Sequence, residues 1–235
     1  MNPTRNPGRI AGLWYLLLCL IGPLRLMYIP GKLFVHDNPT ATASNIAAHQ
    51  WLFRFGIVGD LACALILIFL TLAFYRLFKG VDQYLAILVV IFGGVMPALI
   101  NFVGVVSDAA TLTLVRGADF LSVFNQPQRD ALAMLFLQLH HAGIVANEVF
   151  WGLWLFPFGL LVYRSRFIPR ILGIWLMINC FAYLAVSFTG IFFPNYEDAV
   201  FQSAFPAMVG ELAIMLWLLI KGAKEQPNEH QEINL

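Results

Sequence analysis

Long segments without charge are the feature that most constrains this chain. Residues 61–75 read LACALILIFLTLAFY, and comparably apolar stretches recur along the sequence. Only 11% of the 235 residues are charged and 60% are hydrophobic, whereas soluble domains carry about 25% charged residues. A chain so poor in charge cannot cover a water-facing surface, and we therefore expect its solvent to be the lipid bilayer.

Six segments are apolar and long enough to cross a hydrocarbon core about 30 Å thick. We expect them near residues 9–29, 51–75, 84–106, 138–163, 167–191 and 199–220. The predicted fold class is all-α, a polytopic membrane protein in which residues 1–222 form a single bundle of six transmembrane helices. The polar residues 223–235 are expected to be a disordered cytoplasmic tail.

The basic residues indicate an orientation. With the N-terminus inside, nine lysines and arginines fall in inner segments and only Lys32, Arg116 and Arg129 fall in outer ones, as the positive-inside rule requires. An even number of spans then returns the C-terminus to the cytoplasm. Asn125 followed by Pro127 is typical of a helix start. We expect the outer ends of helices two, three and four to project beyond the membrane as a small extracytoplasmic helical cap.

Charge and cysteine usage exclude several classes. The net charge is only +1, so no field that would attract nucleic acid is expected. The three cysteines lie inside apolar runs, which argues against a disulfide framework. No motif assigns a catalytic residue, a metal ligand or a cofactor, and we expect none of these.

Polar residues inside the spans are the best functional clues, because such groups are costly in lipid and usually face a bundle interior or a cavity. Depths estimated at 1.5 Å per residue place most of them in the outer half of the membrane. We therefore expect a polar pocket there, open to the extracytoplasmic side. Its candidate ligand-binding residues are Arg25, Arg54, Asp60, Asn101, His140, His141, Asn147, Glu148, Tyr183 and Glu211.

These residues also have structural interpretations. The arginines could pair with Asp60 and Glu148 simply to hold helices together, and the histidines could be hydrogen-bonded groups at the interface. Glu211 is harder to explain in this way, because no basic residue lies at a similar depth. It is therefore expected to be neutral, reached by an arginine from another helix, or hydrated.

A set of motifs resembles one known family. The chain carries Phe150-Trp151-Gly152-Leu153-Trp154, then Pro157, Gly159, Tyr163-Arg164-Ser165, Pro169, Leu172-Gly173 and Tyr183, with Arg9-Ile10-Ala11-Gly12 near its start. Together they resemble a bacterial family of small six-span integral membrane proteins known only as a domain of unknown function. Arg166 departs from that pattern, which has a small residue there. The resemblance implies a bacterial cytoplasmic (inner) membrane location and carries no established activity.

Several functions fit these observations. The first is binding of a small amphipathic or lipid-like ligand in the outer pocket. The alternatives are an intramembrane enzyme, metal-dependent or metal-free, using His141, Glu148 and Asp60, and a small proton-coupled transporter using Asp60, Glu148 and Glu211. Further alternatives are a haem protein with two histidine ligands, a homo-oligomer and an accessory subunit of a membrane complex.

Overall fold

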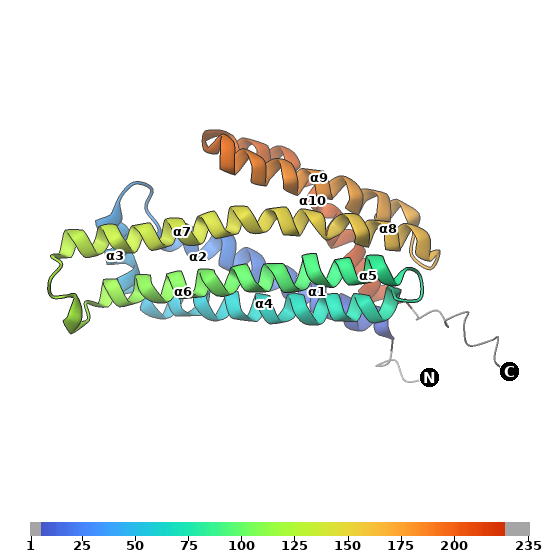
Figure 1. Ribbon diagram of the computed structural model, residues 1–235, viewed down its shortest axis with the longest axis horizontal. Coiled ribbons are helices and arrows are strands. Elements are labelled where there is room, and N and C mark those ends of the chain that lie inside the picture. Colours follow the sequence, from blue (N-terminus) through green and yellow to red (C-terminus); the bar gives the residue numbers. More distant parts are fainter. Residues whose placement is uncertain (1–5, 224–235) are drawn as a thin grey trace. The chain divides into compact units, whose positions relative to one another are not determined.

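The fold is built from helices, and no strand occurs in residues 6–223, which are the residues that the computed structural model describes. Figure 1 shows their course. The elements are α1 (Pro7–Pro23), η2 (Leu24–Tyr28), α2 (Ile29–Leu33), α3 (Pro39–Ala48), α4 (Gln50–Phe78), α5 (Gln83–Val90), η3 (Ile91–Val95), α6 (Met96–Arg116), η4 (Asp119–Leu121), α7 (Gln126–Leu153), α8 (Leu155–Ser165), α9 (Arg170–Phe192), η5 (Pro194–Tyr196) and α10 (Glu197–Ile220).

Six helical segments are long and apolar enough to cross a membrane, which confirms the predicted all-α, six-span fold class. They cover Pro7–Leu33, Gln50–Phe78, Gln83–Arg116, Gln126–Ser165, Arg170–Phe192 and Pro194–Ile220. The third and fourth contain 34 and 40 residues, whereas about 20 suffice to span the hydrocarbon core. All residues of the expected tail except Ala223 lie outside the described part of the chain.

Local sequence signals set the helix boundaries. Asn38 caps α3 by accepting a hydrogen bond from the backbone N–H of Ala41, and Asp82 caps α5 in the same way. The helix start predicted near Asn125 is confirmed, because α7 begins at Gln126 and a reciprocal capping box joins Asn125 to Gln128. Such boxes satisfy two backbone donors that a helix end leaves free.

The chain divides into two compact units, and helices α1, α4, α6 and α7 contribute residues to both. Unit 1 consists of Met1–Leu18, Ile66–Pro97 and Val145–Leu235, and unit 2 of Cys19–Leu65 and Ala98–Ile144. Each unit is described below by itself. The expectation of a single membrane domain over residues 1–222 stays a prediction.

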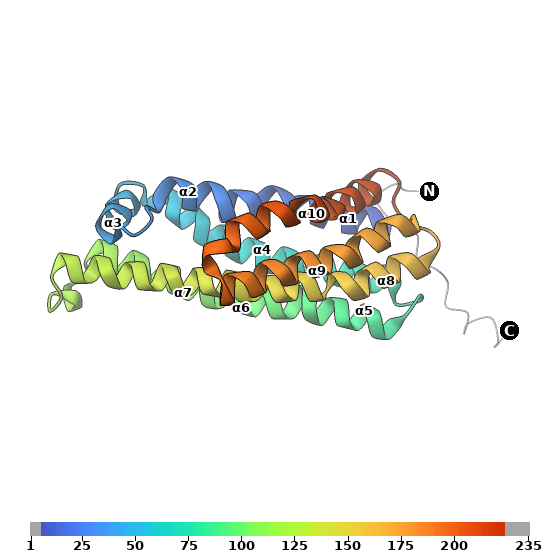
Figure 2. The same ribbon diagram turned by 90° about the horizontal axis from the view of Figure 1, so that it is seen from above.

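Unit 1 has an aromatic core and closely packed helices. Phe74 and Phe158 lie with their ring centroids 4.3 Å apart, and Trp154 stacks on Phe158 at 5.4 Å. Figure 2 shows α9 running alongside both α8 and α10. The approach of α8 to α9 depends on Gly159 and Gly173, because a methyl group on either would lie 2.6 Å from the other's carbonyl oxygen.

Unit 2 carries an apolar core and a polar region. Its buried apolar cluster contains Ile29, Leu33, Ile46, Phe53, Leu112 and Leu137. Helices α6 and α7 run side by side (Figure 1), and the Thr111 hydroxyl of α6 donates to the carbonyl of Ala133 on α7. Beside this core, four helical segments supply the charged side chains of the candidate site.

Candidate functional site

A buried ion pair joins the first and second spans in unit 2. The guanidinium Nε of Arg25 pairs with Oδ1 of Asp60, and both side chains are almost fully buried. Nη2 of Arg25 also donates a hydrogen bond of 3.3 Å to Oδ1 of Asn101. Arg25 lies in the π-helical segment η2, a geometry that often occurs at functional sites. A short polar chain therefore runs from α6 through Arg25 to α4.

A second polar pair joins the third and fourth spans. Nδ1 of His140 on α7 lies 2.7 Å from Oδ1 of Asp108 on α6. Asp108 is 5% exposed. The imidazole packs over Gly104, one turn before Asp108, where a methyl group would lie 3.4 Å from Nε2. The aspartate thus determines the direction of the ring, and the glycine makes room for it.

Arg25, Asp60, Asp108 and His140 all line a cavity of about 700 Å³, and we call the part that they line its charged end. Drug-sized ligands occupy pockets of about 300–1,000 Å³, so the volume suits a small organic molecule. The cavity is lined by Arg25, Leu26, Ile29, Pro30, Phe34, Val35, His36, Asp37, Pro39, Phe53, Gly56, Asp60, Asp108, Met134, Leu137, Gln138, His140, His141 and Ile144. Most of these residues are apolar, and seven of them are ionisable.

Acidic groups outnumber permanent cations in this lining. Three aspartates face a single arginine, together with three histidines. The guanidinium of Arg25 is already engaged by Asp60 and Asn101. A ligand anion would have to share Arg25, whereas a cationic or hydrogen-bonding group would meet free acceptor capacity on Asp60 and Asp108.

Unit 1 contains a separate polar cluster around Glu211 on α10. The Tyr15 hydroxyl donates to its Oε2 at 2.5 Å, and Nδ2 of Asn179 donates to its Oε1 at 3.0 Å. Tyr183 supplies a further side-chain hydrogen bond. The partners of this carboxyl group are thus neutral donors from α1 and α9, and they connect three spans.

The other predicted site residues have varied surroundings. Asn147 and Glu148 are buried on the part of α7 that belongs to unit 1, and Oε2 of Glu148 has no hydrogen-bond partner among the described residues. Arg54 is half-buried on α4 and is not among the lining residues of the cavity. His141 lines the cavity.

Six of the ten site residues predicted from sequence fall into two groups. Unit 2 brings together Arg25, Asp60, Asn101 and His140, and unit 1 brings together Tyr183 and Glu211. The role of these residues in ligand binding stays a prediction.

Asp108 is the main residue that the sequence-based list of site residues omits. It lies on the same helical stripe as Asn101, since Asn101, Gly104 and Asp108 recur at intervals of three and four residues. Its estimated depth also matches that of His140, and comparing these depths would have indicated the pair.

The fold and these buried polar groups define a polytopic all-α membrane protein with a charged cavity inside unit 2. Residues 10–222 match the family described as a domain of unknown function, DUF4386, and the chain belongs to that family. Neither a curated protein nor a solved structure shows a significant match.

Proposed function

We propose that the protein binds a small amphipathic molecule in the cavity of unit 2. The observation that carries this proposal is the lining itself, which joins an apolar wall to a compact charged end in a volume of about 700 Å³. A single-chain molecule would lie along Ile29, Phe53 and Leu137, with its polar group near Asp60 and Asp108. Sites of this kind combine apolar walls with a few polar groups that fix orientation.

The charge balance of the lining favours a cationic or uncharged polar group over an anionic one. Burying a charge without a partner is costly, and Asp60 and Asp108 retain carboxylate oxygens that can accept hydrogen bonds. We therefore expect a long-chain amine or alcohol to bind more tightly than a carboxylate of the same chain length.

A cavity-filling variant tests this function. Gly56 lines the cavity, and a methyl group there would meet only Ile29, at 3.6 Å. Gly56→Leu should therefore fold while it fills part of the space. Gly22→Leu is the matched control, because no atom lies within 4 Å of its Cβ position and Gly22 does not line the cavity.

The measurement is thermal unfolding in lipid nanodiscs with dodecylamine, dodecanol or dodecanoate as the probe. We expect dodecylamine and dodecanol to raise the Tm of the wild type and of Gly22→Leu, since a ligand that binds only the folded state stabilises it. Gly56→Leu should lose the shift. An equal shift in all three proteins would place binding elsewhere, and no shift in the wild type would contradict the proposal.

We also propose that the protein lies in a bacterial cytoplasmic membrane with both termini in the cytoplasm. The distribution of its lysines and arginines supports this orientation, and so does the even number of spans. A C-terminal green fluorescent protein fusion should fluoresce, whereas an alkaline phosphatase fusion at the same point should be inactive. The opposite pattern would reverse the topology.

An intramembrane enzyme is the second candidate, favoured by the Asp108–His140 pair at the cavity. An aspartate that orients an imidazole is a recurrent arrangement for a general base. None of the described lining residues is a serine, threonine or cysteine, so this base would act on water. Turnover of a bound ester probe that persists in His140→Gln would exclude this role.

A further inference from the structure

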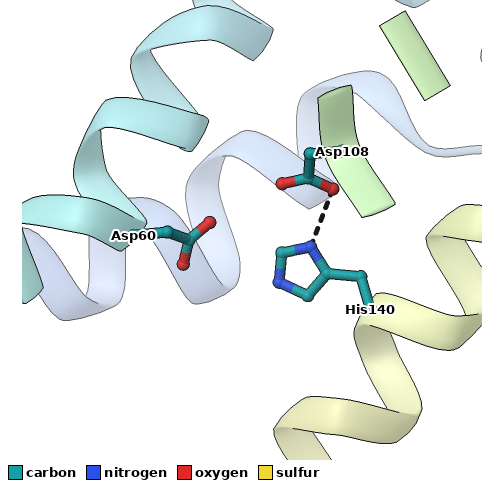
Figure 3. A group of neighbouring side chains, drawn as sticks. All are labelled: Asp60, Asp108 and His140. Atoms are coloured by element: carbon teal, nitrogen blue, oxygen red, sulfur yellow. Dashed lines mark hydrogen bonds and ion pairs between the residues drawn. The ribbon is translucent and has the colours of Figure 1, made fainter. Parts of the chain in front are cut away.

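Three potential metal ligands from three different helices converge at the charged end of the cavity. The carboxylates of Asp60 and Asp108 and the imidazole of His140 each offer one ligand atom, and these atoms lie within 4.8 Å of one another. Figure 3 shows the ring of His140 beneath the carboxylate of Asp108, with one nitrogen directed to Asp108 and the other on the side of Asp60. From this geometry we propose that Asp60, Asp108 and His140 bind one divalent transition-metal ion.

The spacing of these atoms is close to that of a coordination sphere. Ligand atoms about 2.1 Å from a common ion lie roughly 3–4 Å apart. The separations in unit 2 therefore need only small side-chain rotations to reach coordination distance. All three residues sit on regular helices, α4, α6 and α7, which hold their backbones in place.

The charge of the cluster also favours a cation. Two carboxylates and the guanidinium of Arg25 leave one negative charge when His140 is neutral, in a region where Asp60 is 2% exposed. Buried charge of this kind is costly unless it is neutralised. A divalent ion would leave one positive charge, which a metal-bound hydroxide would balance.

Outer contacts already orient one of the carboxylates. Oδ1 of Asp60 pairs with Arg25, which is held in turn by Asn101, and the second oxygen of Asp60 remains for an ion. Hydrogen bonds to ligating carboxylates are a regular feature of metal sites and tune their affinity. Arg25 and Asn101 would thus act as positioning residues and not as ligands.

The donor set indicates the class of ion. A mixed set of imidazole and carboxylates suits Zn²⁺, Fe²⁺ or Mn²⁺ more than Ca²⁺ or Mg²⁺, which prefer oxygen ligands alone. Within residues 6–223 the cluster has three protein ligands, and all three line the cavity. Sites with three protein ligands keep an open position for water or substrate, so the cavity would supply the remaining ligand. The metal site does not depend on the amphipathic ligand proposed above, because its three ligands are the protein's own.

Metal content and affinity of the full-length protein test the inference. The protein, with its purification tag removed, is stripped with a chelator in lipid nanodiscs and dialysed against Zn²⁺, Mn²⁺ or, without oxygen, Fe²⁺. Mass spectrometry should find about one ion per chain for at least one of these metals. Co²⁺ should give visible absorption bands that report a bound nitrogen and oxygen set. Asp60→Asn, Asp108→Asn and His140→Gln should each weaken binding about tenfold or more.

The chain offers a matched control in the same unit. His36 and Asp37 form a histidine–aspartate pair that also lines the cavity, but their side chains are 97% and 85% exposed. The double variant His36→Gln/Asp37→Asn should keep the wild-type stoichiometry and Co²⁺ spectrum. Each variant is compared only when its circular dichroism and elution volume match the wild type.

Two results would overturn the proposal. The first is that folded wild-type protein retains less than about 0.1 ion per chain with every metal. His140 and Asp108 would then be a hydrogen-bonded pair that binds no ion. The other is undiminished binding in the three cluster variants. If those variants do not fold, the wild-type stoichiometry still decides, and Arg25→Lys, which keeps all three ligands, should bind the ion more weakly than the wild type.

Discussion

Nδ1 of His140 lies 2.7 Å from Oδ1 of Asp108, and this contact joins α7 to α6 within unit 2. The two side chains are 17% and 7% exposed, so water competes little for the bond. The same contact orients the imidazole at the charged end of the cavity. The contact therefore links two helices, and it also lies at the proposed ligand-binding cavity and the proposed metal site.

The strength of this contact can be measured by a double-mutant cycle on Asp108→Asn and His140→Gln with a chelator present. We expect a coupling free energy of about 0.5–2 kcal/mol, the range found for interhelical hydrogen bonds in membrane proteins. The readout is reversible unfolding by sodium dodecyl sulfate in mixed micelles. The exposed pair His36 and Asp37 is the control and should show no measurable coupling. A null result for the buried pair would mean that the contact stabilises nothing.

The Arg25–Asp60 pair should show a strong asymmetry between single and double substitutions. Asp60→Leu leaves a buried guanidinium without its carboxylate and should lower the free energy of unfolding by about 3–5 kcal/mol. The double variant Arg25→Met/Asp60→Leu should recover much of that loss, because neither partner of the ion pair is then left buried without the other. The same unfolding assay measures both.

A more exposed ion pair provides the comparison. Arg164 pairs with Asp82 at 2.8 Å, with side chains 53% and 27% exposed. Arg164→Met should cost less than about 1 kcal/mol, as is usual near the surface. If Asp60→Leu costs no more than Arg164→Met, the Arg25–Asp60 pair has no special role in holding unit 2 together.

Glu211 should behave as a structural connector of α1, α9 and α10. Glu211→Leu removes the acceptor of the hydrogen bonds from Tyr15 and Asn179, which should cost about 2–3 kcal/mol of unfolding free energy. Tyr15→Phe removes one donor and should cost about 1 kcal/mol. Proteoliposome flux that is lost in Glu211→Gln while stability is preserved would instead favour the transporter alternative.

Helix packing in unit 1 should depend on two facing glycines. A methyl group at Gly159 would lie 2.6 Å from the carbonyl oxygen of Gly173 and 2.7 Å from Cγ of Met177. Gly159→Ala and Gly173→Ala should therefore each lower the Tm, with a loss of about 1–3 kcal/mol.

The control for these glycines is Gly22 on α1, where the added methyl group meets no atom within 4 Å. Gly22→Ala should leave stability unchanged or raise it by up to about 1 kcal/mol, because alanine is the better helix former. Equal effects at all three positions would show that helix propensity, and not close packing, explains the glycines.

Much of the secondary structure could be predicted from local signals. The six apolar segments determined the number of spans, and the asparagine and proline at positions 125 and 127 located the start of α7. Chain length and apolarity decide whether a segment can cross a bilayer, and both can be counted without knowledge of the fold. The π-helical segments η2 and η3 were not predicted, because one extra residue in a turn depends on the contacts that stabilise it.

Pairing of the polar residues was predicted less well. Estimated depth assigned Arg25, Asp60 and Asn101 to the same outer layer in three different spans, and the structure joins all three. Helical spacing suggested His141 and Glu148 as a chemical pair, whereas the structure pairs His140 with Asp108. Adjacent residues on a helix point about 100° apart, so a small error in the assumed rotation of a helix changes which of them faces the interior.

The sequence by itself determined that this is an all-α chain with six membrane-spanning segments and ionisable groups inside them. These properties follow from composition and from the rise and period of a helix, which are the same wherever the helix is placed. Only the tertiary structure decided that Asp108 orients His140, that Asp60 pairs with Arg25, and that neutral donors surround Glu211. The physical reason is that the depth and helical phase of a residue describe its position on one helix. A contact depends in addition on how two helices are rotated and how far apart they lie.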